Sequence, residues 1–143
     1  MSNKKDYKEK IMSIVQSKGL YSMMNNTKWK ELKNGVADLS FPPPFVIKTV
    51  DEEETAYHQF NEDVSWHGDW GLYLDNYLGG DMYATPFYAV EYIKVRPRYT
   101  KQRGRLISDE LIDETKDFLS ILEKYGIPFE ELSGTFVIYG YRS

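Results

Sequence analysis

The residues best suited to chemistry lie in one short segment, Trp66-His67-Gly68-Asp69-Trp70, which follows an acidic stretch containing His58. An imidazole beside a carboxylate can act as a general acid or base, and both groups also bind metal ions. However, His58 and His67 are nine residues apart in a predicted loop, and no helical or strand spacing fixes them together. We therefore predict no metal site, no catalytic residue and no cofactor, and a small hydrolase around His67 and Asp69 remains an alternative.

A second group of charged residues lies within residues 94–105, which contain six bases and no acid. Guanidinium groups that precede a helix N-terminus can bind phosphate or carboxylate, because their N–H groups and the backbone N–H groups converge. This pattern predicts a nucleic-acid or phosphate-ligand binder as an alternative function, although the same bases can instead pair within the fold or bind an acidic protein. The predicted anion-binding residues are Arg96, Arg98, Lys101, Arg103 and Arg105.

The charges of the chain are segregated along the sequence. The net charge is −4, but residues 1–33 carry eight lysines and three acids, whereas residues 34–93 carry one lysine and eleven acids. Charge blocks of this kind can pair within a fold or steer a charged partner. Aromatic residues make up 15% of the chain, and aromatic side chains are enriched in cores and in protein interfaces.

Several classes of protein are disfavoured by the composition. The chain contains no cysteine, so disulfide and thiolate chemistry is excluded. It has no P-loop, G-x-S-x-G, HExxH or G-x-G-x-x-G motif, so enzymatic activity has no specific support. No apolar run approaches the roughly 20 residues of a membrane span. We expect a cytoplasmic protein that does not bind membranes.

The first 40 residues predict two helices. Residues 5–17 place apolar side chains on one side and lysines on the other. Asn25, Asn26 or Thr27 can cap a second helix in which Trp29 and Leu32 share an apolar face. The segment Phe41-Pro-Pro-Pro-Phe45 then fixes three consecutive φ angles and predicts a rigid joint.

The remainder of the chain predicts a sheet and one long helix. Residues 46–50, 87–99, 127–132 and 135–142 alternate as strands do, and Ser133-Gly134 predicts a tight turn between the last two. Because the last strand is apolar on both faces, we expect it to be central or covered by a partner. Residues 51–85 read mainly as loop.

The long helix is predicted at residues 108–125. Ser108 can cap its first turn, the following acids suit the positive end of the helix dipole, and Gly126 with Pro128 can end it. The sequence thus predicts one α+β domain over residues 1–143, in which residues 1–40 are helical. Residues 41–143 form a mainly antiparallel sheet of about four to five strands with the long helix packed on it.

Several short motifs share one pattern: Trp29-Lys30-Glu31-Leu32, Phe41-Pro-Pro-Pro-Phe45, Val95-Arg96-Pro97-Arg98 and Gly134-Thr135-Phe136 followed by Ile138-Tyr139-Gly140-Tyr141-Arg142. This pattern resembles a family of small uncharacterised bacterial proteins known only as a domain of unknown function. The resemblance implies a bacterial protein of one domain, and it carries no activity, cofactor or functional residue.

The acidic and aromatic composition favours a non-catalytic protein-binding module. One such class is an immunity-type protein, which neutralises a basic toxin or enzyme through an acidic, aromatic face. A homodimer through the last strand is another possible assembly. The predicted partner-binding residues are Glu52, Glu53, Glu54, Glu62, Asp63, Trp66, Asp69 and Trp70.

Overall fold

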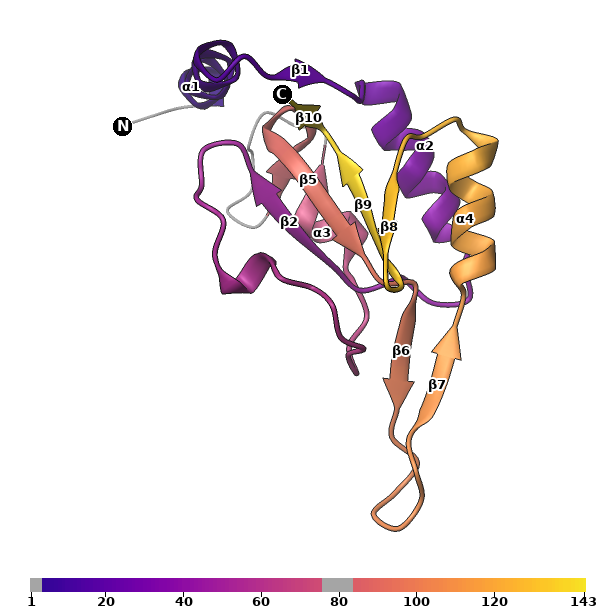
Figure 1. The fold of residues 1–143 in the computed structure, drawn as a ribbon. Coiled ribbons are helices and arrows are strands. Elements are labelled where there is room, and N and C mark those ends of the chain that lie inside the picture. Colours follow the sequence, from indigo (N-terminus) through magenta and orange to yellow (C-terminus); the bar gives the residue numbers. More distant parts are fainter. Residues whose placement is uncertain (1–3, 76–83) are drawn as a thin grey trace.

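The computed structural model describes residues 4–75 and 84–143, and within them the chain has the α+β fold that the sequence predicts (Figure 1). The helices are α1 (Lys4–Ser17), α2 (Asn26–Ala37), η1 (Ala56–His58), α3 (Trp70–Tyr73), η2 (Phe87–Ala89) and α4 (Thr115–Lys124), where η1 and η2 are single 3-10 turns. The strands are β1 (Tyr21–Ser22), β2 (Phe45–Thr49), β3 (Leu74–Asp75), β4 (Thr85–Pro86), β5 (Val90–Val95), β6 (Arg98–Lys101), β7 (Glu110–Asp113), β8 (Glu130–Leu132), β9 (Thr135–Tyr139) and β10 (Tyr141–Arg142).

In the described part of the chain the central sheet has four strands in the order β2-β5-β9-β8, and each is antiparallel to its neighbour. Ile93 of β5 lies opposite Ile47 of β2 and Ile138 of β9. The strand predicted at residues 135–142 is therefore central, since β9 has a neighbour on each side, and its last residues form β10, which pairs with β1. The predicted turn is also confirmed: Ser133 and Gly134 have φ angles of 51° and 87°, as a two-residue hairpin turn requires.

One face of this sheet packs against α2 and α4, which lie side by side (Figure 1). The core there contains Trp29 and Leu32 of α2, Phe118 and Leu122 of α4, and the apolar residues of β5 and β9. A side chain at Gly35 would lie 2.5 Å from Ile121, so glycine lets the two helices approach closely. A smaller cluster holds α1 against η2 and β10.

The Pro42–Pro44 segment joins α2 to β2, as the sequence predicts. Proline has no N–H group, but its carbonyl groups remain available as acceptors. Pro42 accepts from Gly68 N–H at 3.1 Å, and Pro44 accepts from Arg96 N–H at 3.1 Å. The joint therefore binds two segments that are distant in sequence.

The helix predicted at residues 108–125 begins later, at Thr115. Residues 110–113 instead form β7, which pairs with β6 in a hairpin that projects from the body (Figure 1). The pairing places Arg98 opposite Asp113 and Lys101 opposite Glu110, and such opposite charges favour an antiparallel pair. The first turn of α4 is bonded by Asp113, which accepts from the backbone N–H of Thr115 at 2.8 Å, and not by Ser108.

Candidate functional site: an aromatic cavity beside strand β2

A cavity of about 600 Å³ lies beside β2. Phe45 and Ile47 of β2 form one wall, and Tyr57, Tyr73 and residues 66–69 form the others. Residues 66–69, which belong to the segment predicted to be best suited to chemistry, thus line the cavity. Residues 76–83, which belong to the predicted loop region 51–85, lie outside the described residues.

Residues 66–70 are held against the proline joint. Trp70 is buried and donates its indole N–H to the carbonyl oxygen of Pro43 at 2.9 Å, and its ring contacts Phe45 with centroids 4.7 Å apart. A Cβ atom at Gly68 would lie 2.3 Å from the same oxygen, so only glycine fits there. Trp70 therefore supports the wall of the cavity, and its buried ring is not part of the exposed surface.

His67 is exposed and packs between two aromatic rings. Its ring centroid lies 5.5 Å from that of Phe41 and 4.5 Å from that of Tyr99. Asp69 caps α3, because its carboxylate accepts from the backbone N–H of Leu72 at 2.9 Å. Within residues 4–75 and 84–143 no hydrogen bond joins His67 to Asp69. The two side chains are therefore not arranged as an acid–base pair in this structure.

Trp66 extends into solvent from the rim of the cavity. Its ring stacks on that of Phe60, with centroids 5.8 Å apart and planes 11° apart, yet 45% of the residue is exposed. Tyr57 and Tyr73, which also line the cavity, are 68% and 43% exposed. The sequence did not predict Tyr57, Tyr73, Phe45 or Ile47 as site residues, because nothing in the order of residues shows that β2 lies beside this loop.

Several of the acidic residues that were predicted to bind a partner instead contact other residues of this protein. Asp63 binds two arginines: its Oδ1 lies 2.7 Å from Arg96 Nη2 and 2.8 Å from Arg98 Nε. Burial raises the pKa of Asp63, but the hydrogen bonds and charges of the two arginines outweigh it and hold the pKa below its usual value. This carboxylate therefore takes part in ion pairs within the fold.

Two of the predicted glutamates also bind residues within the fold. Glu52 lies 3.3 Å from Nε2 of the buried His58, and Glu54 accepts a hydrogen bond from the hydroxyl of Tyr92. That bond lowers the pKa of Glu54. Glu53 and Glu62 are exposed, so they are the acids of this stretch that a partner would meet most directly.

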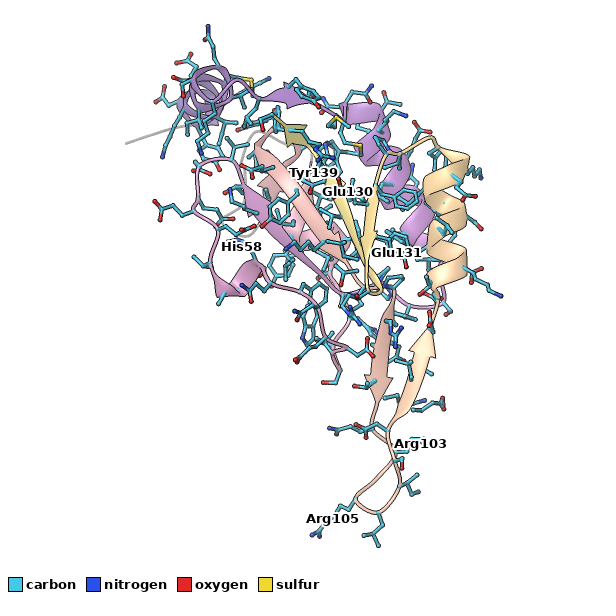
Figure 2. The ribbon with its side chains drawn as sticks, in the orientation of Figure 1. His58, Arg103, Arg105, Glu130, Glu131 and Tyr139 are labelled. Carbon is cyan, nitrogen blue, oxygen red and sulfur yellow. The ribbon has the colours of Figure 1, made fainter. Side chains whose placement is uncertain are left out.

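The sheet face opposite the helices carries further polar contacts. Arg142 Nη1 lies 2.7 Å from Glu130 Oε1, and Tyr139 donates to Glu130 Oε2 at 3.3 Å. Figure 2 shows Tyr139 and Glu130 close together on the sheet, with His58 on the loop that lies over the other edge. Lys48 is buried on this face and its Nζ lies 3.1 Å from Glu91. These contacts join strands to one another across the sheet.

The predicted anion-binding residues fall into two groups. Arg96 is 5% exposed, and besides Asp63 it binds the hydroxyl of Thr135 at 2.8 Å, so it serves the fold, as Arg98 does through Asp63. Lys101, Arg103 and Arg105 are exposed on the β6–β7 hairpin. Figure 2 shows Arg103 and Arg105 in the distal part of that hairpin. The two groups do not form one site.

In residues 4–75 and 84–143, no group of three or more histidine, aspartate or glutamate side chains is placed to hold a metal ion. None of the helices that the structure describes is long and apolar enough to span a bilayer.

The fold is thus an α+β domain with an aromatic cavity at one edge of an antiparallel sheet and a basic hairpin projecting from it. A family model matches residues 11–143, and the chain belongs to that family, a family of unknown function (DUF6678). The resemblance seen in the short motifs is thereby confirmed as membership of a domain-of-unknown-function family. No curated protein and no solved structure matches the chain.

Proposed function

We propose that this chain is a non-catalytic protein-binding module whose partner docks on the aromatic cavity beside β2. The observation that supports this most strongly is the exposure of three aromatic residues, Tyr57, Trp66 and Tyr73, around one cavity. Tyrosine and tryptophan are the residues that most often dominate binding energy in protein interfaces. A shallow cavity among them offers a place for an anchoring side chain of the partner.

The charges near the cavity favour a basic partner. Asp69 lines the cavity, and Glu53 and Glu62 are exposed in the segment that also carries Tyr57. Acidic groups at the rim of an interface raise the association rate with a basic surface and disfavour acidic ones. A basic toxin or enzyme, neutralised by an immunity-type protein, is the partner class that fits this proposal.

A pull-down from a lysate of the native host tests the proposal. The lysate is treated with nuclease, and the wild-type chain is compared with Trp66→Ala, Tyr57→Ala and the pair Glu53→Lys with Glu62→Lys. Leu132→Ala is the matched control, because Leu132 is 64% exposed on β8, at the opposite edge of the sheet.

We expect one stoichiometric protein with the wild type and the control, and loss of that protein with the cavity variants. Equal recovery with all variants would refute the proposal. The two glutamates are chosen because reversing Asp63 or Glu54 would also break contacts within the fold.

A second candidate function, binding of nucleic acid or a phosphate ligand, rests on the β6–β7 hairpin. Lys101, Arg103 and Arg105 are exposed there, and Leu106 beside them is 100% exposed. Basic side chains on a projecting two-stranded ribbon can reach phosphates, and a ribbon of this width fits the major groove of DNA.

Salt dependence tests this second candidate. Affinity for a DNA duplex should fall as the salt concentration rises. Replacing both Arg103 and Arg105 by glutamine should make the slope of log K against log salt shallower by about 0.9 for each phosphate group that the variant no longer neutralises. Binding that is absent at low salt would exclude this function.

A further inference from the structure

Among the residues that the structure describes, strand β2 lies at an edge of the central sheet, with β5 as its neighbour on one side. In an antiparallel pair, alternate residues of an edge strand direct their backbone N–H and C=O groups toward the neighbour and away from it. Pro44 C=O accepts from Arg96 N–H, and Val50 N–H donates to Ala89 C=O, so the even-numbered residues face β5. Phe45, Ile47 and Thr49 therefore face away.

Two observations at the ends of β2 agree with this assignment. Pro43, which has the same parity as Phe45, accepts from the indole of Trp70 and not from β5. Thr49 N–H donates to the carboxylate of Glu52 at 2.8 Å. Both ends of the outer edge are thus occupied by side chains of this protein, and the stretch between them is Phe45–Ile47.

That stretch lies in the wall of the aromatic cavity, since Phe45 and Ile47 both line it. Among the described residues, no hydrogen bond outside the β2–β5 ladder engages the backbone of Phe45 or Ile47. Edge strands with unpaired N–H and C=O groups are templates for another strand. The proline joint precedes this stretch, and the bulge at Lys48/Thr49 and the buried Lys48 follow it, so these edge features flank Phe45–Ile47.

We infer that an extended segment of a protein partner binds in this cavity as an additional strand on β2, through main-chain hydrogen bonds to Phe45 and Ile47. This inference rests on the proposed function and names its recognition mode. In strand addition the backbone bonds give affinity and pockets for alternate side chains give specificity. The exposed rings of Tyr57 and Trp66 and the carboxylate of Asp69 would contact those side chains. The partner segment should therefore place every second side chain in the cavity, and one of these side chains should be basic.

A displayed library of linear peptides provides the probe. Binders are selected on the wild-type chain, and those that bind Trp66→Ala equally well are removed. Each remaining peptide is then synthesised in versions with one backbone nitrogen methylated. We expect about tenfold weaker binding when alternate residues are methylated and little change at the residues between them, because only alternate N–H groups face β2.

Two variants at one position provide the control on the protein. Ile47→Pro removes an N–H that faces the cavity and leaves the ladder to β5 intact, and proline is tolerated at such edge positions. Ile47→Ala shortens the same side chain but keeps the N–H. We expect Ile47→Pro to bind the selected peptides at least about tenfold more weakly than Ile47→Ala. Thermal melting must first show that both variants are folded.

The inference fails if no linear peptide is enriched, if methylation has no alternating effect, or if the two Ile47 variants bind equally. None of these results would disprove the proposed function, because a partner could dock on the cavity with a folded surface. Equal recovery of the partner by the wild type and by Trp66→Ala in the pull-down would refute both the inference and the proposed function.

Discussion

Trp70 donates its indole N–H to the carbonyl oxygen of Pro43 at 2.9 Å, and this bond fixes the cavity wall to the proline joint. The donor is buried, and the carbonyl oxygen of Pro43 supplies the acceptor that a buried indole N–H requires. The same carbonyl excludes any side chain at Gly68. The geometry of the cavity thus depends on a few atoms of the joint between α2 and β2.

Replacing Gly68 by alanine should destabilise the protein. The new methyl group would lie 2.3 Å from Pro43 O, and that oxygen belongs to rigid backbone, so the loop must shift. We expect a loss of about 1–3 kcal/mol in the free energy of unfolding, measured by urea denaturation. Gly71→Ala is the matched control: among the described residues its methyl group meets nothing nearer than Asp69 Oδ1 at 3.8 Å, so it should not destabilise the protein. Equal stability of the two variants would contradict the packing described here.

Asp63 should make the stability depend on pH in acid. Its pKa in the folded state is below that of an unfolded aspartate, which is about 3.9. A lowered pKa stabilises the fold above the unfolded value, and this stabilisation is lost as the pH falls through the folded pKa. Asp63→Asn should cost about 1–3 kcal/mol at pH 7, because it leaves the buried Arg96 without its carboxylate.

The same variant tests how the contribution of Asp63 to stability depends on pH. The difference in unfolding free energy between wild type and Asp63→Asn should shrink between pH 5 and pH 2. Urea denaturation at each pH measures it. A constant difference across that range would show that the two arginines do not hold the carboxylate in its charged form.

The start of α4 can be tested by two alanine substitutions. Asp113→Ala removes the acceptor of both the backbone N–H and the hydroxyl of Thr115, the first residue of α4, and should destabilise the protein by about 1 kcal/mol. Ser108→Ala should change the stability by less than about 0.5 kcal/mol, because Ser108 is exposed in the hairpin loop. The reverse order would support a helix that begins at residue 108.

The sequence predicted most of the fold because most elements depend on local pattern. A cap within residues 25–27, the proline joint and the Ser133-Gly134 turn each follow from the residues themselves, and each is present, with Asn25 as the cap. The helix start was misplaced for a non-local reason. Residues 108–114 contain good helix signals, but Leu111 and Ile112 pair with Thr100 and Tyr99 across the hairpin, and this tertiary pairing outweighs local propensity.

The candidate site was only partly predictable for the same reason. Trp66 and Asp69 were identified from their residue types, and both line the cavity. Asp63 was predicted to bind a basic partner and Arg96 was predicted to bind an anion. The two residues instead form an ion pair with each other, although they are 33 residues apart in the sequence. Which charges meet a partner and which meet each other depends on the packing of the loop against β6 and β9, which no local pattern reveals.

Amide hydrogen exchange on the complex with the captured partner tests the central claim most directly. The chain is exchanged alone and in the complex, and protection is followed by residue. We predict slower exchange at Phe45, at Ile47 and in residues 64–73, with little change in the β6–β7 hairpin. Protection confined to residues 98–113, with none beside β2, would contradict the account and place the interface on the basic hairpin.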